Sequence, residues 1–176
     1  PHGYGAQPLY TLEIGNKTYS FGIRTVIIEQ LPDEKESAYY RKCLEIKDSI
    51  SGKIYDHNEN FSGFRLLING VPIMCKGANW VPSEPFPSAE TDRKITALLS
   101  LAKEAGVNML RVWGGGIFEK PHFYRECDRL GILVTQDFLM ACGHYPEEND
   151  AFIDQLRRET EFAAYELRNH PALVWW

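Results

Sequence analysis

Four apolar segments of the sequence each end in residues that suit the binding of a polar ligand. A tryptophan ring can stack on a sugar ring, and an arginine or an aspartate can hydrogen-bond its hydroxyl groups. The set therefore favours a carbohydrate over an apolar ligand. In chain order the residues are Asn79 and Trp80, Arg111 and Trp113, Asp137, and the pair Trp175 and Trp176.

The same residues also have a purely structural interpretation, which the sequence leaves open. Arg111 and Asp137 have opposite charges and can form an ion pair with each other. The tryptophans can fill a core. Only the repeated position of these residues, at one segment end after another, favours binding over packing.

A glycine run offers a rival function. Gly114 and Gly116 stand between an apolar segment and a predicted helix, and Asp137 closes the next segment, as a ribose-binding carboxylate does in dinucleotide folds. Glu119 stands where that fingerprint needs its third glycine. A long acidic side chain hinders an approaching pyrophosphate, so no cofactor is expected.

Neither the histidines nor the cysteines have the spacing of a metal site. The sequence contains no HExxH or CxxC motif, and no GxSxG motif of a serine hydrolase. No metal is expected. The scattered cysteines predict buried free thiols in a reducing compartment, which favours the cytoplasm. They are Cys43, Cys75, Cys127 and Cys142.

Composition excludes several classes of partner. The 176 residues carry 19 Lys and Arg against 24 Asp and Glu, a net charge of -5. No basic run exceeds Arg157–Arg158, which argues against nucleic acid. No apolar stretch approaches the length of a membrane span. The apolar run at residues 172–176 is followed by no turn or polar tail, which predicts a piece of a longer protein.

The elements that must position these residues fall into two parts. Residues 9–14, 18–21 and 24–28 alternate like strands around a turn at Gly15–Asn16, which predicts the last hairpin of a β-sandwich. Two or three strands do not stand alone in water, so earlier strands are expected. Residues 31–62 are predicted to form an exposed linker with at most one strand.

From Phe64 onward, strands alternate with helices. Helices are predicted at 92–105, from Pro121 to 130 and at 150–168, between strands that begin near 73, 107, 132 and 172. The apolar residues predicted to face inward are, helix by helix, Ile95, Leu98, Leu99, Ala102 and Ala105; Phe123, Tyr124, Cys127 and Leu130; and Phe152, Leu156, Ala163 and Leu167. This alternation predicts an α/β fold with a parallel sheet. Four such units make the first half of a (β/α)₈ TIM barrel, and a doubly wound sheet is the alternative.

The motifs in this second part resemble glycoside hydrolase family 2, and within it the β-mannosidases. The resemblance covers Phe64 to Trp176 almost continuously, and residues 3–10 and 21–25 are similar to the closing strands of that family's immunoglobulin-like sandwich. The matching motifs are Asn69-Gly70-Val71-Pro72, Lys76-Gly77-Ala78-Asn79-Trp80-Val81-Pro82, Asn108 to Gly116, Gly131 to Phe138, and Asn169 to Trp176.

The resemblance implies two domains and a sugar-cleaving parent protein. Residues 1–63 are expected to be the end of the sandwich and a linker, and residues 64–176 the first half of the catalytic barrel. The implied activity is removal of terminal β-D-mannose from oligosaccharides with retention. The implied sugar-binding residues are Arg111, Trp113, Asp137, Asn79 and Trp80.

No catalytic residue is expected within the chain. Retaining hydrolysis uses two carboxyls about 5 to 5.5 Å apart, and the resemblance places both beyond Trp176. Glu84, Glu119, Glu147 and Glu148 follow strand ends, but they are not expected to supply the pair. The segment alone is therefore expected to be inactive.

Two other functions remain open from the sequence. One is β-galactosidase or β-glucuronidase specificity in the same family, and the other is a non-catalytic carbohydrate-binding module. The expected partners are an oligosaccharide or mannoside substrate and the rest of the parent chain, with no nucleic acid and no membrane. Whether the parent protein is a homo-oligomer is left open.

Overall fold

The computed structural model of the chain describes residues 1–32, 34–35, 37–49 and 62–176. Its contacts divide into two compact units, one of residues 25–74 and one of residues 1–24 and 75–176. The predicted domain boundary between residues 63 and 64 lies within a strand, β4 (Ser62–Ile68), and the division into sandwich and barrel stays a prediction.

The helices and strands follow one another along the chain in this order. The elements are β1 (Tyr10–Ile14), β2 (Lys17–Phe21), β3 (Val26–Pro32), α1 (Ala38–Ser49), β4 (Ser62–Ile68), β5 (Val71–Ile73), β6 (Gly77–Trp80), the 3₁₀ turn η1 (Pro87–Ala89), α2 (Asp92–Glu104), β7 (Met109–Val112), α3 (Pro121–Leu130), β8 (Leu133–Gln136), α4 (Asp150–Leu167) and β9 (Leu173–Trp175).

The unit of residues 25–74 is built on an antiparallel sheet. β4 pairs with β3 on one side and with β5 on the other. The turn between β4 and β5 places Asn69 and Gly70 at positive φ, 52° and 77°, which suits a two-residue hairpin with Asn-Gly. The sequence predicted a strand over residues 24–28, and β3 overlaps it at residues 26–28 and continues to Pro32.

Helix α1 corrects the expectation for residues 31–62. An exposed linker with at most one strand was predicted there, but residues 38–49 form a helix. Its start is capped, since the Ser37 hydroxyl accepts a hydrogen bond from the Tyr40 backbone N–H at 3.0 Å. Lys42 and Glu45 pair at 2.9 Å one turn apart. Residues 50–61 lie outside the described part of the chain.

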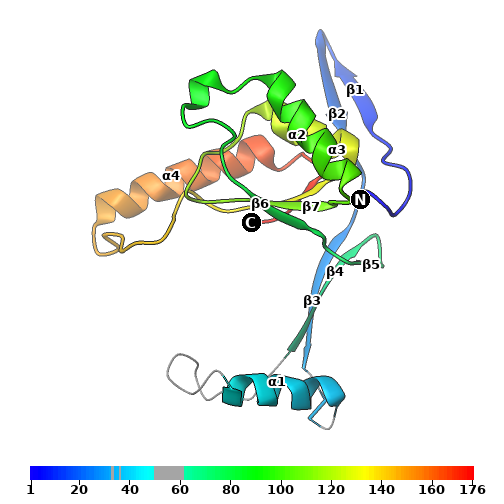
Figure 1. Cartoon of the computed structure of the whole chain (residues 1–176). Coiled ribbons are helices and arrows are strands. Elements are labelled where there is room, and N and C mark those ends of the chain that lie inside the picture. Colours follow the sequence, from blue (N-terminus) through cyan, green and yellow to red (C-terminus); the bar gives the residue numbers. More distant parts are fainter. Residues whose placement is uncertain (33, 36, 50–61) are drawn as a thin grey trace. The chain divides into compact units, whose positions relative to one another are not determined.

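The larger unit contains a four-stranded parallel sheet in the order β6-β7-β8-β9. Each strand is joined to the next by a segment that holds one α-helix, α2, α3 or α4 in turn. Figure 1 shows α2 and α3 side by side over this sheet. The predicted α/β alternation with a parallel sheet is confirmed.

The predicted first strand near residue 73 is in fact two strands. β5 ends at Ile73 in the antiparallel sheet, and β6 begins at Gly77 in the parallel one. Asn108 holds the residue between them in the larger unit, because its side-chain oxygen accepts from the Lys76 N–H at 2.8 Å and its own N–H donates to the Lys76 carbonyl at 2.8 Å. These bonds align β6 with β7.

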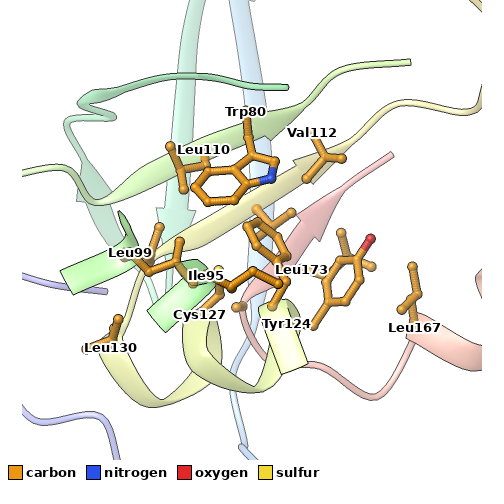
Figure 2. Packing of buried hydrophobic residues seen from close by; sticks show 14 residues of the cluster. Trp80, Ile95, Leu99, Leu110, Val112, Tyr124, Cys127, Leu130, Leu167 and Leu173 are labelled. Carbon is orange, nitrogen blue, oxygen red and sulfur yellow. The ribbon is translucent and has the colours of Figure 1, made fainter. Parts of the chain in front are cut away.

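One apolar core fills the space between the helices and the parallel sheet (Figure 2). Ile95 and Leu99 of α2 are fully buried, as their helical spacing predicted. In α3 the four residues predicted to face inward are also buried: Phe123, Tyr124, Cys127 and Leu130. Burial raises the pKa of the Cys127 thiol well above its usual value. The amphipathic pattern of α2 and α3 is therefore confirmed.

Helix α4 follows its predicted pattern less closely. Ala163 and Leu167 are buried, whereas Phe152 and Leu156 are only half-buried. The helix begins at a cap in which the Asn149 side chain accepts from the N–H groups of Ala151 and Phe152. Among the helices in the described ranges, none combines the length and the apolar composition that crossing a membrane requires.

The N-terminal hairpin of β1 and β2 belongs to the larger unit, and one arginine makes two of the hydrogen bonds that attach it. Arg24 donates to the backbone carbonyls of Pro171, at 3.1 Å, and Leu173, at 2.6 Å. Partial burial lowers the pKa of the Arg24 guanidinium, and the nearby Asp128 carboxylate opposes that effect. One side chain thus joins residue 24 to the start of β9.

Candidate functional site

Three of the predicted site residues meet at the end of the parallel sheet. Asn79 of β6 lies opposite Arg111 of β7, and Asp137 follows β8. The Arg111 guanidinium donates to both oxygens of Asp137, from Nε at 3.1 Å and from Nη2 at 2.6 Å, and from Nη1 to the Asn79 side-chain oxygen at 3.2 Å. Parallel strands bring their carboxyl ends to one edge, which explains this cluster.

The cluster keeps binding capacity for a ligand. A guanidinium has about five N–H donors, of which the contacts to Asp137 and Asn79 use three, so two remain among the contacts described. The Arg111 side chain is 48% exposed and that of Asp137 27% exposed. Arg111 and Asp137 therefore form the ion pair that the sequence allowed, but the arginine side chain faces solvent and is not buried.

The glycine run after β7 has a packing cause. The Gly114 N–H donates to Asp137 Oδ2 at 3.2 Å, and a Cβ at Gly114 would lie 2.5 Å from the carbonyl oxygens of Phe138 and Met140. A Cβ at Gly115 would overlap the Trp113 ring. The small residues let this loop lie against Asp137 and Trp113, an arrangement that needs no bound phosphate.

Trp113 lies in the same loop and is half-buried. Its backbone N–H donates to the Trp80 carbonyl at 3.0 Å, which continues the β6–β7 pairing by one residue. Its indole lies against the Gly115 backbone. Its role in sugar binding stays a prediction.

Trp80 lies apart from the Asn79–Arg111–Asp137 cluster. Its side chain is on the core side of the sheet and only 8% of the residue is exposed. The indole packs on Phe123, with ring centroids 4.9 Å apart, and its Nε1–H donates to Glu119 Oε1 at 3.0 Å (Figure 2 shows the indole in the core). A direct role of Trp80 in sugar binding stays a prediction, since its indole lies in the core.

Two buried glutamates lie behind this tryptophan. Glu119 is 5% exposed and Glu90 is 4% exposed. Burial, reinforced by the charge of Glu90, raises the pKa of Glu119 to about 7, although the bond from Trp80 acts in the opposite direction. Sequence reasoning considered Glu119 as a carboxylate near the site and missed Glu90, which no motif marks.

The other loop glutamates considered from the sequence occupy ordinary surface positions. Glu84 forms an ion pair with Lys94 at 2.6 Å. Glu147 and Glu148 are exposed in the loop before α4. In the described part of the chain, none of these three glutamates forms a hydrogen bond with Asn79, Arg111 or Asp137.

Aromatic side chains border the cluster on the β9 side. Trp175 is 43% exposed and pairs in register with Thr135 of β8. Thr135 in turn pairs with Arg111 of β7, so Trp175 lies two strands from Arg111. Trp176 is 38% exposed and stacks on Phe138, with ring centroids 5.2 Å apart and planes 10° apart. The sheet end thus combines a charged centre with flat apolar surfaces, which suits the two kinds of face on a sugar ring.

Metal ligands and disulfides do not contribute to this site. Within the described ranges no three His, Cys, Asp or Glu side chains are grouped as metal ligands. All four cysteines are free. Burial was predicted for all of them, but only Cys127 is buried, while Cys43 is half-buried and Cys75 and Cys142 are exposed.

Comparison with known proteins identifies the relatives of the chain. No family model matches it. Over its whole length it is 35% identical to β-mannosidase from Bos taurus, 38% to β-mannosidase from Rattus norvegicus and 34% to β-mannosidase B from Neosartorya fischeri. The chain spans about a fifth of these curated relatives, 18%, 18% and 19% of their lengths.

Solved structures give the same result for the fold. A β-D-mannosidase from Dictyoglomus thermophilum superposes with a TM-score of 0.80 at 39% identity, over 99% of this chain and 20% of that protein. A β-glucuronidase from Bacteroides uniformis superposes with a TM-score of 0.64 at 20% identity, over 95% of this chain and 18% of that one. The second likeness shows the fold alone.

The fold of the chain is thus similar to that of the glycoside hydrolases of family 2. Within that class the sequence similarity is to the β-mannosidases, along the whole chain. The resemblance predicted from the motifs is confirmed.

Proposed function

We propose that the chain is part of a retaining exo-β-mannosidase that removes terminal β-D-mannose from oligosaccharides. The observation that carries the proposal is the Asn79–Arg111–Asp137 cluster, at the strand ends of a chain that is 34–39% identical to β-mannosidases over at least 99% of its length. The cluster provides directed donors and acceptors, which are what a neutral sugar offers for recognition.

In this proposal the chain forms the wall that binds the terminal sugar. Arg111 donates from its free N–H groups to sugar oxygens, and Asp137 holds the guanidinium in a fixed plane through two parallel bonds. Trp113 and the tryptophans after β9 offer aromatic faces for the apolar side of the ring. Asn79 fixes the guanidinium from the β6 side.

The carboxyl pair for bond cleavage is assigned to other parts of the protein. Retaining hydrolysis requires an acid/base and a nucleophile about 5 to 5.5 Å apart at the scissile bond. Here Asp137 is occupied by Arg111, and Glu90 and Glu119 are buried in the interior. Since the chain is about a fifth of its relatives, the remaining length has room for both groups.

We also propose the finer architecture that the family resemblance implies. In this proposal β6 to β9, with α2, α3 and α4, are the first half of a (β/α)₈ TIM barrel. Residues 1–63 then hold the last strands of an immunoglobulin-like sandwich and a linker. The parallel order of the four strands and the TM-score of 0.80 support the barrel part.

Hydrolysis of aryl glycosides tests the proposed activity. The full-length protein is expected to hydrolyse an aryl β-mannoside faster than the matching β-galactoside and β-glucuronide, and the 176-residue segment is expected to hydrolyse none of them. A clear preference for one of the other two sugars would reject mannose as the substrate. Turnover by the segment alone would show that its own carboxyls are catalytic.

A further inference from the structure

Two glutamates from different loops lie together in the interior: besides burial, the charge of Glu90 and a side-chain hydrogen bond with it raise the pKa of Glu119. Glu90 follows η1 in the loop between β6 and α2, and Glu119 lies in the loop between β7 and α3. Both residues are almost completely buried, at 4% and 5% exposure. A buried carboxylate is costly unless donors or opposite charges satisfy it, so this pairing needs an explanation.

One oxygen of each carboxyl has an evident partner. Glu119 Oε1 accepts from the Trp80 indole N–H at 3.0 Å. Glu90 Oε1 accepts from the Ser83 hydroxyl at 2.6 Å and from the Ser83 backbone N–H at 3.3 Å. These donors come from β6 and from the loop directly after it, and the Lys120 backbone N–H also interacts with the Glu119 carboxyl and lowers its pKa.

The other two oxygens are left without a donor if both groups are ionised. Within the described part of the chain, Glu90 Oε2 and Glu119 Oε2 are buried and have no hydrogen-bond partner. Two carboxylates cannot donate to each other, but an acid and a carboxylate can. One proton between the two side chains turns both unsatisfied oxygens into a single hydrogen bond.

The charges around the pair do not replace that proton. Lys120 donates to the Glu90 backbone carbonyl at 2.5 Å, and Lys94 donates to the Ser83 carbonyl and to Glu84, both at 2.6 Å. Both lysines thus bind oxygens other than the two unsatisfied ones. Tyr124 and Cys127 of α3 interact electrostatically with Glu119, and burial raises the pKa of each, so both side chains stay neutral.

We propose that Glu90 and Glu119 share one proton and act as a positioning pair, which ties the loop after β6 to the loop after β7 and thereby fixes the sugar-binding end of the sheet. Neither residue touches the sugar in this proposal. They act through Trp80, whose neighbour Asn79 contacts Arg111 and whose carbonyl accepts from Trp113. The effect on activity rests on the proposed function, whereas the shared proton does not.

The sign of the pH dependence follows from the same geometry. The pKa of Glu119 is raised to about 7, from an ordinary value of 4.5. The folded protein therefore binds the proton that the unfolded chain releases, and the stabilisation is complete below 4.5 and lost as the pH rises through about 7. Above that range two buried carboxylates repel each other, and the two loops separate.

Measurements on the full-length protein that need no substrate test the shared proton. Infrared titration is expected to show a protonated carboxyl that disappears near pH 7 and is absent in Glu119→Gln. The Gln amide can still accept from Trp80 and donate to Glu90, so the fall in Tm from about pH 5 to about pH 8 is expected to be smaller than in the wild type. The control Glu104→Gln, on the exposed end of α2, should keep the wild-type pH dependence.

The opposite results would overturn the proposal. A wild-type protein with no carboxyl that loses its proton near pH 7, a Glu119→Gln variant that keeps that signal, or a Glu119→Gln variant whose Tm falls with pH in parallel with the wild type excludes the shared proton. Glu90→Gln serves the same purpose if Glu119→Gln does not fold. In that variant the amide of residue 90 donates to the Glu119 carboxylate and takes the place of the shared proton.

An activity profile tests the positioning role separately. The KM for an aryl β-mannoside is expected to rise roughly threefold or more above pH 7 in the wild type, with kcat little changed, and to lose this rise in Glu119→Gln. A KM that rises equally in both proteins rejects the positioning role. If the full-length protein hydrolyses no β-mannoside, the proposed function fails, while the infrared and Tm measurements still decide the shared proton.

Discussion

Asp137 is the residue on which the strand-end cluster depends. Its carboxylate accepts two bonds from Arg111 and one from the Gly114 N–H, so it fixes both the guanidinium and the start of the glycine loop. Bidentate pairs of this kind fix a plane as well as a distance. The orientation of Arg111 toward a ligand is therefore set by a neighbour rather than by its own flexible chain.

Replacement of Asp137 tests this dependence. In Asp137→Asn the side chain keeps its size but loses the charge and one acceptor oxygen, so Arg111 loses its fixed plane. The expected loss in kcat/KM on an aryl β-mannoside corresponds to about 1.5–3 kcal/mol, the usual value of a charged hydrogen bond. Steady-state kinetics of the full-length protein measure it.

A surface ion pair gives the matched control. Glu126 and Arg129 form a two-bond pair within α3, at 3.0 and 2.8 Å. Glu126→Gln removes the same charge and should leave kcat/KM within about 0.5 kcal/mol of the wild type. Equal activity of Asp137→Asn and the wild type would mean that sugar binding does not involve this cluster.

At the scale of elements, the register of β6 against β7 depends on a glycine. A Cβ placed on Gly77 would overlap the carbonyl oxygen of Met109, an atom of the paired strand that cannot move without breaking the sheet. Gly77 has no positive φ, so close approach alone requires the glycine here.

Gly77→Ala is therefore expected to destabilise the protein. The expected loss is at least about 1–3 kcal/mol, the cost of forcing extra volume into a packed structure, and chemical unfolding measures it. Gly143→Ala is the control, since a Cβ at Gly143 meets no atom within 4 Å. Similar stability of the two variants would contradict the close strand pairing at Gly77.

Much of this architecture could be predicted because its signals are local. The stripe that contains Ile95 and Leu99, and the sequence Pro121 to Gly131 with its terminal glycine, define helices by spacing and capping alone. Helix α1 was missed, although Ser37 is a good cap, because its charged residues are typical of a loop as well. The break between β5 and β6 depends on Asn108, which is distant in sequence.

The candidate site also has features that the sequence predicts and features that only the folded structure shows. The positions of Asn79, Arg111 and Asp137 followed from a general rule about parallel strands, and the structure brings the three together. The sequence could not show that Trp80 faces the core, because side-chain direction depends on where the strand begins. Nor could it pair Glu90 with Glu119, since that contact exists only when two loops meet.

For the whole molecule, Arg24 is one of the contacts that hold residues 1–24 to the rest of the larger unit, beside the bond from the His2 N–H to the Gly131 carbonyl at 2.7 Å. Its guanidinium bonds two backbone carbonyls, of Pro171 and Leu173, more than 140 residues away in the sequence. The apolar side chains of the hairpin are largely exposed, among them Leu12 at 48% and Ile14 at 60%, and contribute little burial of their own.

Arg24→Ala should therefore loosen the hairpin without unfolding the sheet. Loss of two charge-assisted bonds is expected to weaken its attachment by about 1.5–3 kcal/mol, so limited proteolysis of the full-length protein should cut residues 1–24 faster. Lys17→Ala, an exposed change within β2, is the control and should leave the cleavage rate unchanged. Unaltered cleavage in Arg24→Ala would show that other contacts hold the hairpin.

The burial of Cys127 has a practical consequence for measuring motion in this protein. A thiol reagent attacks the thiolate, and the raised pKa and full burial of this sulfur block the reaction while α3 stays packed on the sheet. Cys75 and Cys142 are exposed and Cys43 is half-buried, and all three can be replaced by serine beforehand. The remaining slow labelling at Cys127 then reports how often the core opens beneath the parallel sheet.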